Sequence, residues 1–327
     1  MRRSLILLGI KLLVSGSLLY WVLSSINRED LFAAVLSLDP VLLAVAFGAL
    51  VLQYPVGALR WYEILKLLGF TLGWREIFRV HLVGVSLNQM LPSALGGDAY
   101  RVWRIGRTGN GWGRAVSSVL LDRVAALAIL ILLLLAMLPQ LVTILPDGSL
   151  VRSLTILVCV AAASMPVLFF SARAVARLLE MNRFTRRLAP IARNADLLWS
   201  KGTASLRIAG FGLLTQLSTV LCVWLIASAA GAGVDFFTML GLTLPVLLTL
   251  ALPISIAGWG VREGAMVFAL GLIGVPAETG LLVSLVWGGL SLFGGVVCGI
   301  AFLLQDSERQ RLAVYAAEST HLSERKD

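Results

Sequence analysis

Long apolar stretches alternate with short polar connections along most of the chain. The candidate membrane segments are residues 4–25, 40–59, 77–91, 115–138, 151–171, 206–229, 237–252, 264–275 and 280–304. Crossing the hydrocarbon core of a bilayer takes about 20 mostly apolar residues. Segments 77–91, 237–252 and 264–275 are shorter than that, so we do not expect them to be full spans. The pattern predicts an all-α polytopic membrane protein.

Arginine and lysine are unevenly distributed over the connections. They are concentrated in connections 60–79, 101–114 and 173–201, whereas connections 139–150, 230–236 and 276–279 contain none. Loops rich in Arg and Lys stay on the cytoplasmic side of a membrane. The connections obey this rule if 77–91 enters the membrane and returns to the cytoplasm, and if 237–275 does the same from outside. We therefore expect about six full spans, two re-entrant helical elements, and both termini in the cytoplasm.

The two expected re-entrant elements carry the same motif. Residues 91–101 read LPSALGGDAYR and residues 252–262 read LPISIAGWGVR, so both follow L-P-x4-G-x3-R. Helix-breaking residues beside an arginine are tolerated at membrane depth only where the backbone lines a protein or water cavity. Interrupted helices at matching places in two halves indicate the binding site of a transporter. The structural positions of the motifs are Pro92, Gly96, Gly97, Pro253, Gly258 and Gly260.

The motifs divide the chain into two similar halves. Residues 1–145 form the first membrane repeat and 146–305 the second, and 306–327 form a polar cytoplasmic tail. Each repeat has two spans, a re-entrant element and a third span. Because three crossings is an odd number, the second repeat is upside down relative to the first, which predicts an inverted-topology repeat.

The basic segment 172–204 has two interpretations. Its residues Val175, Leu178, Leu179 and Leu188 give an apolar face among many arginines, which is typical of a helix lying on the membrane surface. The alternative is a basic cytoplasmic loop with no further function.

Ionisable residues inside a membrane are costly, which makes them functional candidates. The candidates for substrate binding are Arg101, Arg262, Asp98, Glu263, Asn88 and Gln89. Asp98 and Arg101 are three residues apart, so a helix places them on one face as a pair. Arg262 and Glu263 are adjacent, so we expect them to point in different directions.

Other charged residues near the ends of apolar runs are ambiguous. Asp122 and Arg123 begin a long apolar helix and are either functional or interfacial anchors. The pair Arg60-Trp61 is typical of the interface belt of a membrane protein.

Several classes of function are not expected. The chain is 58% hydrophobic and 14% charged, and its net charge of +9 fits cytoplasmic loops facing anionic lipids better than a nucleic-acid partner. The histidines are His81 and His321, and the three cysteines are isolated, so neither a metal site nor a cofactor is expected. The sequence shows no nucleophile with a base, so we do not expect an enzyme. A lipid-modifying enzyme acting through Asp98 or Glu263 is the alternative.

The residues around the motifs resemble a known family. The matching residues are Asn88-Gln89-Met90-Leu91-Pro92-Ser93, Gly96-Gly97-Asp98, Arg101, Pro253-Ile254-Ser255, Gly258, and Gly260 with Val261-Arg262-Glu263-Gly264. Together, over about residues 5–305, they resemble the flippase-like lysylphosphatidylglycerol synthase transmembrane family, the membrane domain of the bacterial multiple peptide resistance factor. The resemblance implies lipid translocation across the cytoplasmic membrane of a prokaryote. In the resistance factor an aminoacyltransferase domain follows. This sequence has no such domain, so synthase activity is not expected.

These inferences predict a flippase for a phosphate-bearing lipid, of the phospholipid, glycolipid or polyprenyl-phosphate type. Arginine suits a phosphate because it stays charged and binds two oxygens at once. The expected partners are membrane lipids with anionic headgroups. A lipid-synthesising enzyme and a second copy of the chain are further candidates. The competing interpretation is a scaffold for a lipid-modifying complex.

Overall fold

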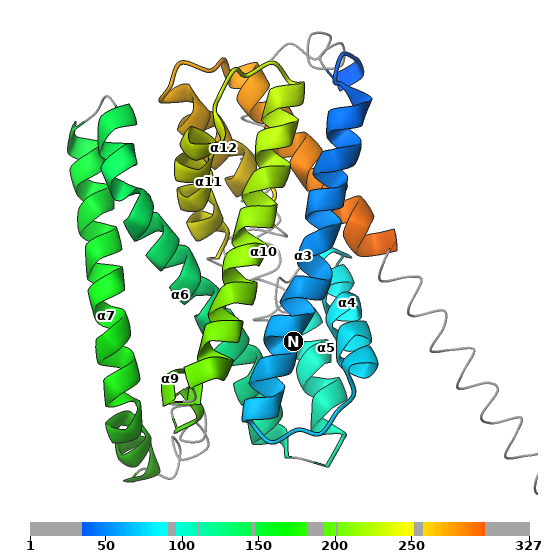
Figure 1. Ribbon diagram of the computed structural model, residues 1–327, viewed down its shortest axis with the longest axis vertical. Coiled ribbons are helices and arrows are strands. Elements are labelled where there is room, and N and C mark those ends of the chain that lie inside the picture. Colours follow the sequence, from blue (N-terminus) through cyan, green and yellow to red (C-terminus); the bar gives the residue numbers. More distant parts are fainter. Residues whose placement is uncertain are drawn as a thin grey trace, which may run out of the picture.

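The computed structural model describes residues 35–90, 96–109, 111–145, 148–181, 193–195, 197–200, 202–251 and 258–297, and within these residues every regular element is a helix (Figure 1). The helices are α3 (Pro40–Leu67), α4 (Trp74–Met90), α5 (Gly96–Gly106), α6 (Trp112–Ile144), α7 (Gly148–Met181), α9 (Leu197–Ser200), α10 (Gly202–Ala229), α11 (Phe236–Leu250) and α12 (Val261–Gly271), followed by a last helix, Ala277–Val297. The predicted all-α class is confirmed.

Helices α3, α6, α10 and the last helix are long and apolar enough to cross a membrane. They contain most of the predicted segments 40–59, 115–138, 206–229 and 280–304. The predicted span 151–171 lies within α7, whose apolar part is the shorter stretch Val151–Val167. The first predicted segment, 4–25, lies outside the described residues, so the count of six spans stays a prediction.

Helix α7 also corrects one boundary. It continues to Met181, so the first part of the basic segment 172–204 is the end of α7 and not a separate element. No Gly or Pro interrupts the chain from Val167 to Met181, and its Ala, Leu and Arg residues favour helix. Leu188 lies outside the described residues.

The short elements form two helical hairpins. Helix α4 packs against α5, and α11 packs against α12. Figure 1 shows the first hairpin at the lower end of the bundle and the second in its upper half, and each hairpin enters and leaves by its own end. Both predicted short elements are therefore paired helices. A symmetric relation between the two halves stays a prediction.

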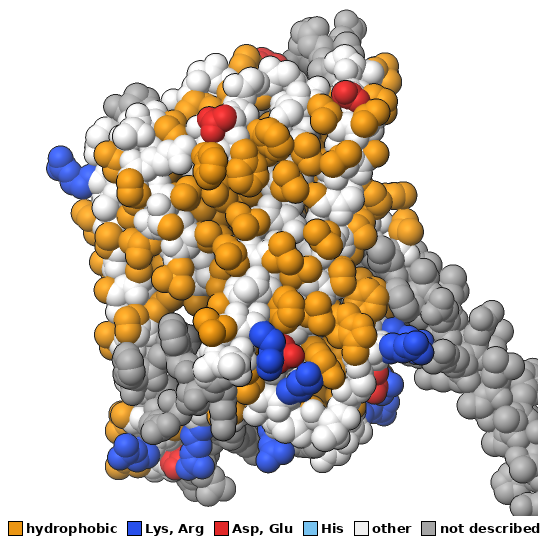
Figure 2. All heavy atoms as spheres, in the orientation of Figure 1, with side chains coloured by type: hydrophobic (Ala, Val, Ile, Leu, Met, Phe, Trp, Pro, Cys, Tyr) orange, Lys and Arg blue, Asp and Glu red, His pale blue; other side chains and the backbone are white. Residues whose placement is uncertain are grey.

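The connections group by charge at the two ends. The end of α3, the start of α4, the end of α5, the start of α6 and the end of α7 lie at the lower end, whereas the end of α6, the start of α7, the end of α10 and the start of α11 lie at the upper end (Figure 1). Most Lys and Arg side chains on the visible face gather towards the lower end, below a broad hydrophobic surface (Figure 2). This separation is the one expected of a protein that spans a membrane.

The hydrophobic core includes the contact of α3 with α10, which is the most extensive one among the described helices from α3 to α12. One cluster joins α3, α6, α10, α11 and α12 around Leu50, Leu134, Val223 and Leu244. A second cluster lies at the lower end, where the hairpin α4–α5 covers Trp61 and Ile64 of α3. The hairpin therefore buries residues that would face lipid or water if α3 stood alone.

Candidate functional site

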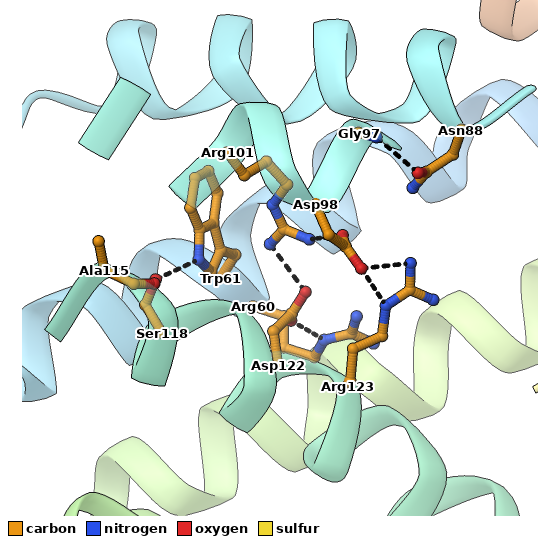
Figure 3. A network of polar contacts seen from close by, with 10 residues as sticks. All are labelled: Arg60, Trp61, Asn88, Gly97, Asp98, Arg101, Ala115, Ser118, Asp122 and Arg123. Carbon is orange, nitrogen blue, oxygen red and sulfur yellow. Dashed lines mark hydrogen bonds and ion pairs between the residues drawn. The ribbon is translucent and has the colours of Figure 1, made fainter. Parts of the chain in front are cut away.

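Asp122 is the centre of a buried ion network at the lower end of the bundle. It lies on α6, is 2% exposed, and accepts hydrogen bonds from two arginines (Figure 3). Arg60 Nε donates to Asp122 Oδ1 at 2.8 Å, and Arg101 Nη2 donates to Asp122 Oδ2 at 2.8 Å. One carboxylate therefore joins helices α3, α5 and α6.

Asp98 is the second carboxylate of the network. Arg101 Nη1 donates to Asp98 Oδ1 at 3.4 Å, which confirms the predicted pair. Arg123 of α6 donates to Asp98 Oδ2 through Nε at 2.9 Å and Nη2 at 2.8 Å. The network of Arg60, Arg101, Arg123, Asp98 and Asp122 has three cations and two anions, so one positive charge is in excess.

Trp61 holds Arg101 in place. The guanidinium carbon of Arg101 lies 4.0 Å from the centroid of the Trp61 ring, a cation–π distance. Trp61 Nε1 donates to Ser118 Oγ at 3.3 Å, and Ser118 Oγ donates to the Ala115 carbonyl oxygen at 2.8 Å (Figure 3). The Trp61 ring therefore contacts Arg101 through its face and Ser118 through its Nε1 edge.

Two interpretations made from the sequence need correction here. Arg60 and Trp61 are not an interface belt pair, because they are 8% and 0% exposed under the α4–α5 hairpin. Asp122 is not an interfacial anchor, because it is buried between two arginines, whereas the side chain of its neighbour Arg123 is 54% exposed.

Small residues and one amide hold the hairpin that delivers Arg101. The backbone nitrogen of Gly97, at the start of α5, donates to Oδ1 of Asn88, near the end of α4, at 2.8 Å. A Cβ at Gly97 would collide with the backbone oxygen of Gly84, so the two helices touch at their glycines. Small residues allow this close approach of membrane helices. Asn88 therefore has a structural contact in this hairpin.

The second motif forms a separate ion pair. Arg262 donates to Glu263 Oε1 through Nε at 3.0 Å and Nη2 at 2.7 Å. Glu263 Oε2 accepts from the backbone nitrogen of Gly260 at 2.6 Å, which caps α12. The two side chains do not point apart as expected, because the long arginine side chain folds back onto its neighbour. The guanidinium lies against Gly288, where a Cβ would collide with it.

Tryptophans flank this second pair. The guanidinium carbon of Arg262 lies 4.6 Å from the ring centroid of Trp259 and 5.5 Å from that of Trp287. Both motif arginines therefore have a carboxylate partner and an aromatic face, although they lie on different hairpins.

A polar cavity of about 330 Å³ lies between α3, α4, α10, α11 and the last helix. Its polar lining residues are Gln53, Tyr54, Arg60, His81, Gln89, Thr215, Gln216, Thr219 and Ser291, and Trp287 is also part of the wall. Arg60 is bonded to Asp122 and also lines this cavity, so it connects the ion network to it. A polar cavity among apolar helices is the feature expected where a polar group enters a membrane protein.

The comparison with known families agrees with this architecture. Residues 8–299 match the family described as Lysylphosphatidylglycerol synthase TM region. The chain belongs to this family. Over 122 residues it is also 27% identical to the UPF0104 membrane protein MJ1595 of Methanocaldococcus jannaschii, in a match that covers 37% of this chain and 36% of that protein. The family resemblance found in the sequence is thus confirmed.

Within this member of the lysylphosphatidylglycerol synthase TM family, the predicted substrate-binding residues other than Asn88 fall into three groups. Gln89 lines the cavity. Arg101 and Arg262 are not part of its wall, but Arg101 shares Asp122 with the lining residue Arg60, and Arg262 stacks on the lining residue Trp287. Asp98 and Glu263 pair with the arginines, as described above. Pro92 and Pro253 lie outside the described residues.

Sequence reasoning missed Arg60 and His81 as lining residues. The sequence did contain a signal for Arg60. Asp122 lies in an apolar helix and therefore needs a cationic partner, and the two motifs do not say which residue that partner is. His81 gave no such signal. It is 7% exposed, and its Nδ1 has no hydrogen-bond partner among the described residues.

Proposed function

We propose that the protein translocates a phosphate-bearing lipid across the cytoplasmic membrane of a prokaryote without modifying it. The observation that carries the proposal is the cavity with Arg60 in its wall. A phospholipid headgroup must cross about 30 Å of hydrocarbon. A polar cavity with one cationic side chain lowers the cost of that passage, because the phosphate meets a fixed counter-ion on the way.

Arg60 is oriented for this task. Its Nε is held by Asp122, and its terminal amino groups have no hydrogen bond to any described residue. A guanidinium fixed at one nitrogen presents its other two to a phosphate in the two-pronged geometry that arginine favours. Arg101 contributes indirectly. It shares the negative charge of Asp122, so the positive charge of Arg60 is not fully neutralised.

The two hairpins support an inverted-repeat mechanism. Each brings a motif arginine with a carboxylate partner into the bundle, from opposite ends. If the halves are related as the sequence predicts, alternate movement of the hairpins opens the cavity first to one side and then to the other. In this proposal Arg101 and Arg262 are matching parts of two gates, and both chain termini are cytoplasmic.

The proposal is tested by reconstitution. Purified protein is placed in liposomes that contain a trace of fluorescent phosphatidylglycerol labelled on the acyl chain, and dithionite bleaches the outer leaflet. We expect bleaching beyond the outer-leaflet fraction, and a loss of that extra bleaching in Arg60→Gln. Bleaching equal to protein-free vesicles would contradict the proposal.

Mass spectrometry of the same vesicles addresses the competing functions. Unchanged lipids are expected. A new lipid species made by the protein alone would support the lipid-modifying enzyme. Transport that appears only with a lipid-synthesising enzyme added would make that enzyme an obligatory partner.

A further inference from the structure

We propose that the headgroup carried by this cavity is anionic and bears uncharged hydroxyl groups, and that lipids with a cationic aminoacyl headgroup are poor substrates. This inference rests on the proposed translocation and names the class of lipid that the same cavity takes.

The charges of the cavity wall carry the argument. Arg60 is the only Lys or Arg among the described lining residues, and no Asp or Glu is among them. His81 also lines the cavity, and neither of its protonation states adds a negative charge. The described part of the wall therefore offers a cationic partner for a phosphate and no anionic partner for an ammonium group.

The charge of Arg60 is not cancelled by its neighbours. Asp122 divides its two oxygens between Arg60 and Arg101, and Asp98 binds Arg101 and Arg123. The excess charge of the network lies with the half-exposed Arg123, but Arg60 shares its only carboxylate partner with Arg101, so a phosphate in the cavity adds a second counter-ion for Arg60. A headgroup with an added ammonium brings a second cation beside Arg60 in a space where charge is poorly solvated.

The uncharged polar groups of the wall suit hydroxyls. Thr215 and Ser291 donate their protons to the carbonyl oxygens of Phe211 and Trp287, at 2.8 and 2.7 Å. Thr219 donates to the carbonyl oxygen of Thr215 at 3.0 Å or to Gln53 Oε1 at 3.1 Å. Their oxygens are thereby left as acceptors. The amides of Gln89 and Gln216 both donate and accept. A hydroxyl can donate to these oxygens and accept from the amides, so both of its hydrogen-bonding functions find partners; an ammonium can donate to the same oxygens but meets no carboxylate among the described lining residues.

The tryptophan of the wall already has a cationic neighbour. The face of Trp287 is already within cation–π distance of Arg262, at 5.5 Å. The volume of about 330 Å³ lies near the lower end of the range for small-ligand sites, about 300–1,000 Å³. It holds a small headgroup while the acyl chains stay in the bilayer.

The test compares two lipids in one preparation. Proteoliposomes contain acyl-labelled phosphatidylglycerol or acyl-labelled lysylphosphatidylglycerol, which differ in the added aminoacyl cation. We expect phosphatidylglycerol to cross at least about tenfold faster. Equal rates, or faster movement of the lysyl lipid, would overturn this inference and leave the proposed translocation standing. If neither lipid crosses faster than in empty vesicles, the proposed function fails as well.

A charge-gain variant makes the test independent of folding damage. Gln216→Glu adds a carboxylate to the wall with almost no change of shape, and Gln140→Glu on α6, outside the wall, is the matched control. We expect Gln216→Glu to slow phosphatidylglycerol and to speed the lysyl lipid, while Gln140→Glu keeps wild-type rates. Faster transport of the lysyl lipid by Gln216→Glu could not be explained by misfolding, which only lowers transport. Unchanged preference in Gln216→Glu would contradict the assignment.

A last experiment tests whether the substrate is a lipid or a soluble anion, since free glycerol phosphate has the same phosphate and hydroxyl groups. Vesicles with the wild-type protein are given radiolabelled glycerol phosphate outside. No uptake above empty vesicles is expected. Uptake without lipid movement would show that the cavity carries a soluble anion and would overturn the lipid assignment.

Discussion

Asp122 joins two arginines that are far apart in the sequence, and each depends on it for a counter-charge. Arg60 and Arg101 are 8% and 5% exposed, and Asp122 holds both at 2.8 Å. Removing one member of such a buried group leaves an uncompensated charge, which costs about 3–5 kcal/mol. At the residue scale, the carboxylate therefore has more influence on stability than either arginine has alone.

We expect Asp122→Asn to lower the free energy of unfolding by about 3–5 kcal/mol, because both arginines lose their shared anion. The measurement is thermal unfolding in detergent. Glu278→Gln is the control, since Glu278 is exposed and exposed substitutions change stability by about 0.5 kcal/mol or less. Equal unfolding temperatures of the two variants would rule out a structural role for the network.

Arg101 and Arg262 are expected to need the planar guanidinium of arginine, because each uses two of its nitrogens to bind carboxylate oxygens. Arg101 uses two nitrogens for two carboxylates, and Arg262 uses two for Glu263. Lysine has the charge but only one nitrogen, so Arg101→Lys and Arg262→Lys each lose a charged hydrogen bond of about 1.5–3 kcal/mol. Transport should fall about tenfold or more.

The half-exposed Arg207 is a matched control for these changes. Its side chain is 54% exposed and pairs with Glu63 at 2.9 Å, so Arg207→Lys should keep the wild-type transport rate. If Arg101→Lys and Arg262→Lys also keep that rate, both arginines are positive-inside anchors.

At the scale of elements, the hairpin α4–α5 joins two short helices into one structural unit. Neither α4 nor α5 is long enough to cross a membrane, but together they cover the end of α3 and bring Arg101 to Asp122. The contact of Gly84 with Gly97 and the bond from Gly97 to Asn88 fix their spacing. The position of the ion network therefore depends on how closely these helices approach.

We expect Gly97→Ala to destabilise the protein by about 1–3 kcal/mol, the usual cost of inserting a methyl group into a packed contact. Its added Cβ meets the backbone of Gly84, which cannot move aside as a side chain can. Gly113→Ala on α6 is the control, because a Cβ there has open space. Thermal unfolding of both variants measures the difference, and a Gly97→Ala protein as stable as Gly113→Ala would contradict the close contact.

At the scale of the whole molecule, the chain separates its charged connections into two ends. Most Lys and Arg side chains on the visible face lie towards the end that contains the α4–α5 hairpin, and the helix ends on either side of the α6–α7 and α10–α11 connections lie at the other end (Figures 1 and 2). This arrangement gives the molecule one orientation in a membrane that follows the positive-inside rule.

We expect Gly113→Cys to be labelled only from the cytoplasmic side and Ser149→Cys only from outside. The background is a variant without Cys159, Cys222 and Cys298. The reagent is a membrane-impermeant maleimide, applied to intact cells and to inverted vesicles. Labelling of Gly113→Cys on intact cells would place the 101–114 connection outside and would reject the re-entrant hairpin.

The apolar pattern and the charge of the connections were sufficient for much of the fold. Predicted segments 115–138 and 206–229 lie inside α6 and α10, and the shorter segments 77–91 and 237–252 correspond to α4 and α11 within a few residues. Such elements can be read from sequence because apolar length and loop charge act locally. The predicted boundary between 151–171 and 172–204 was wrong, since α7 continues to Met181. Polar residues alone do not end a helix when no Gly or Pro interrupts it.

The sequence by itself determined the membrane class, the family, the paired motifs and the contact of Asp98 with Arg101, which is set by helical spacing. Only the tertiary structure decided that Arg60, not a motif arginine, lines the cavity, and that Asp122 is shared between α3 and α5. These contacts join residues 62 and 21 positions apart. No local pattern specifies them, because they arise only when the α4–α5 hairpin covers α3 and makes the burial of a charge depend on its partners.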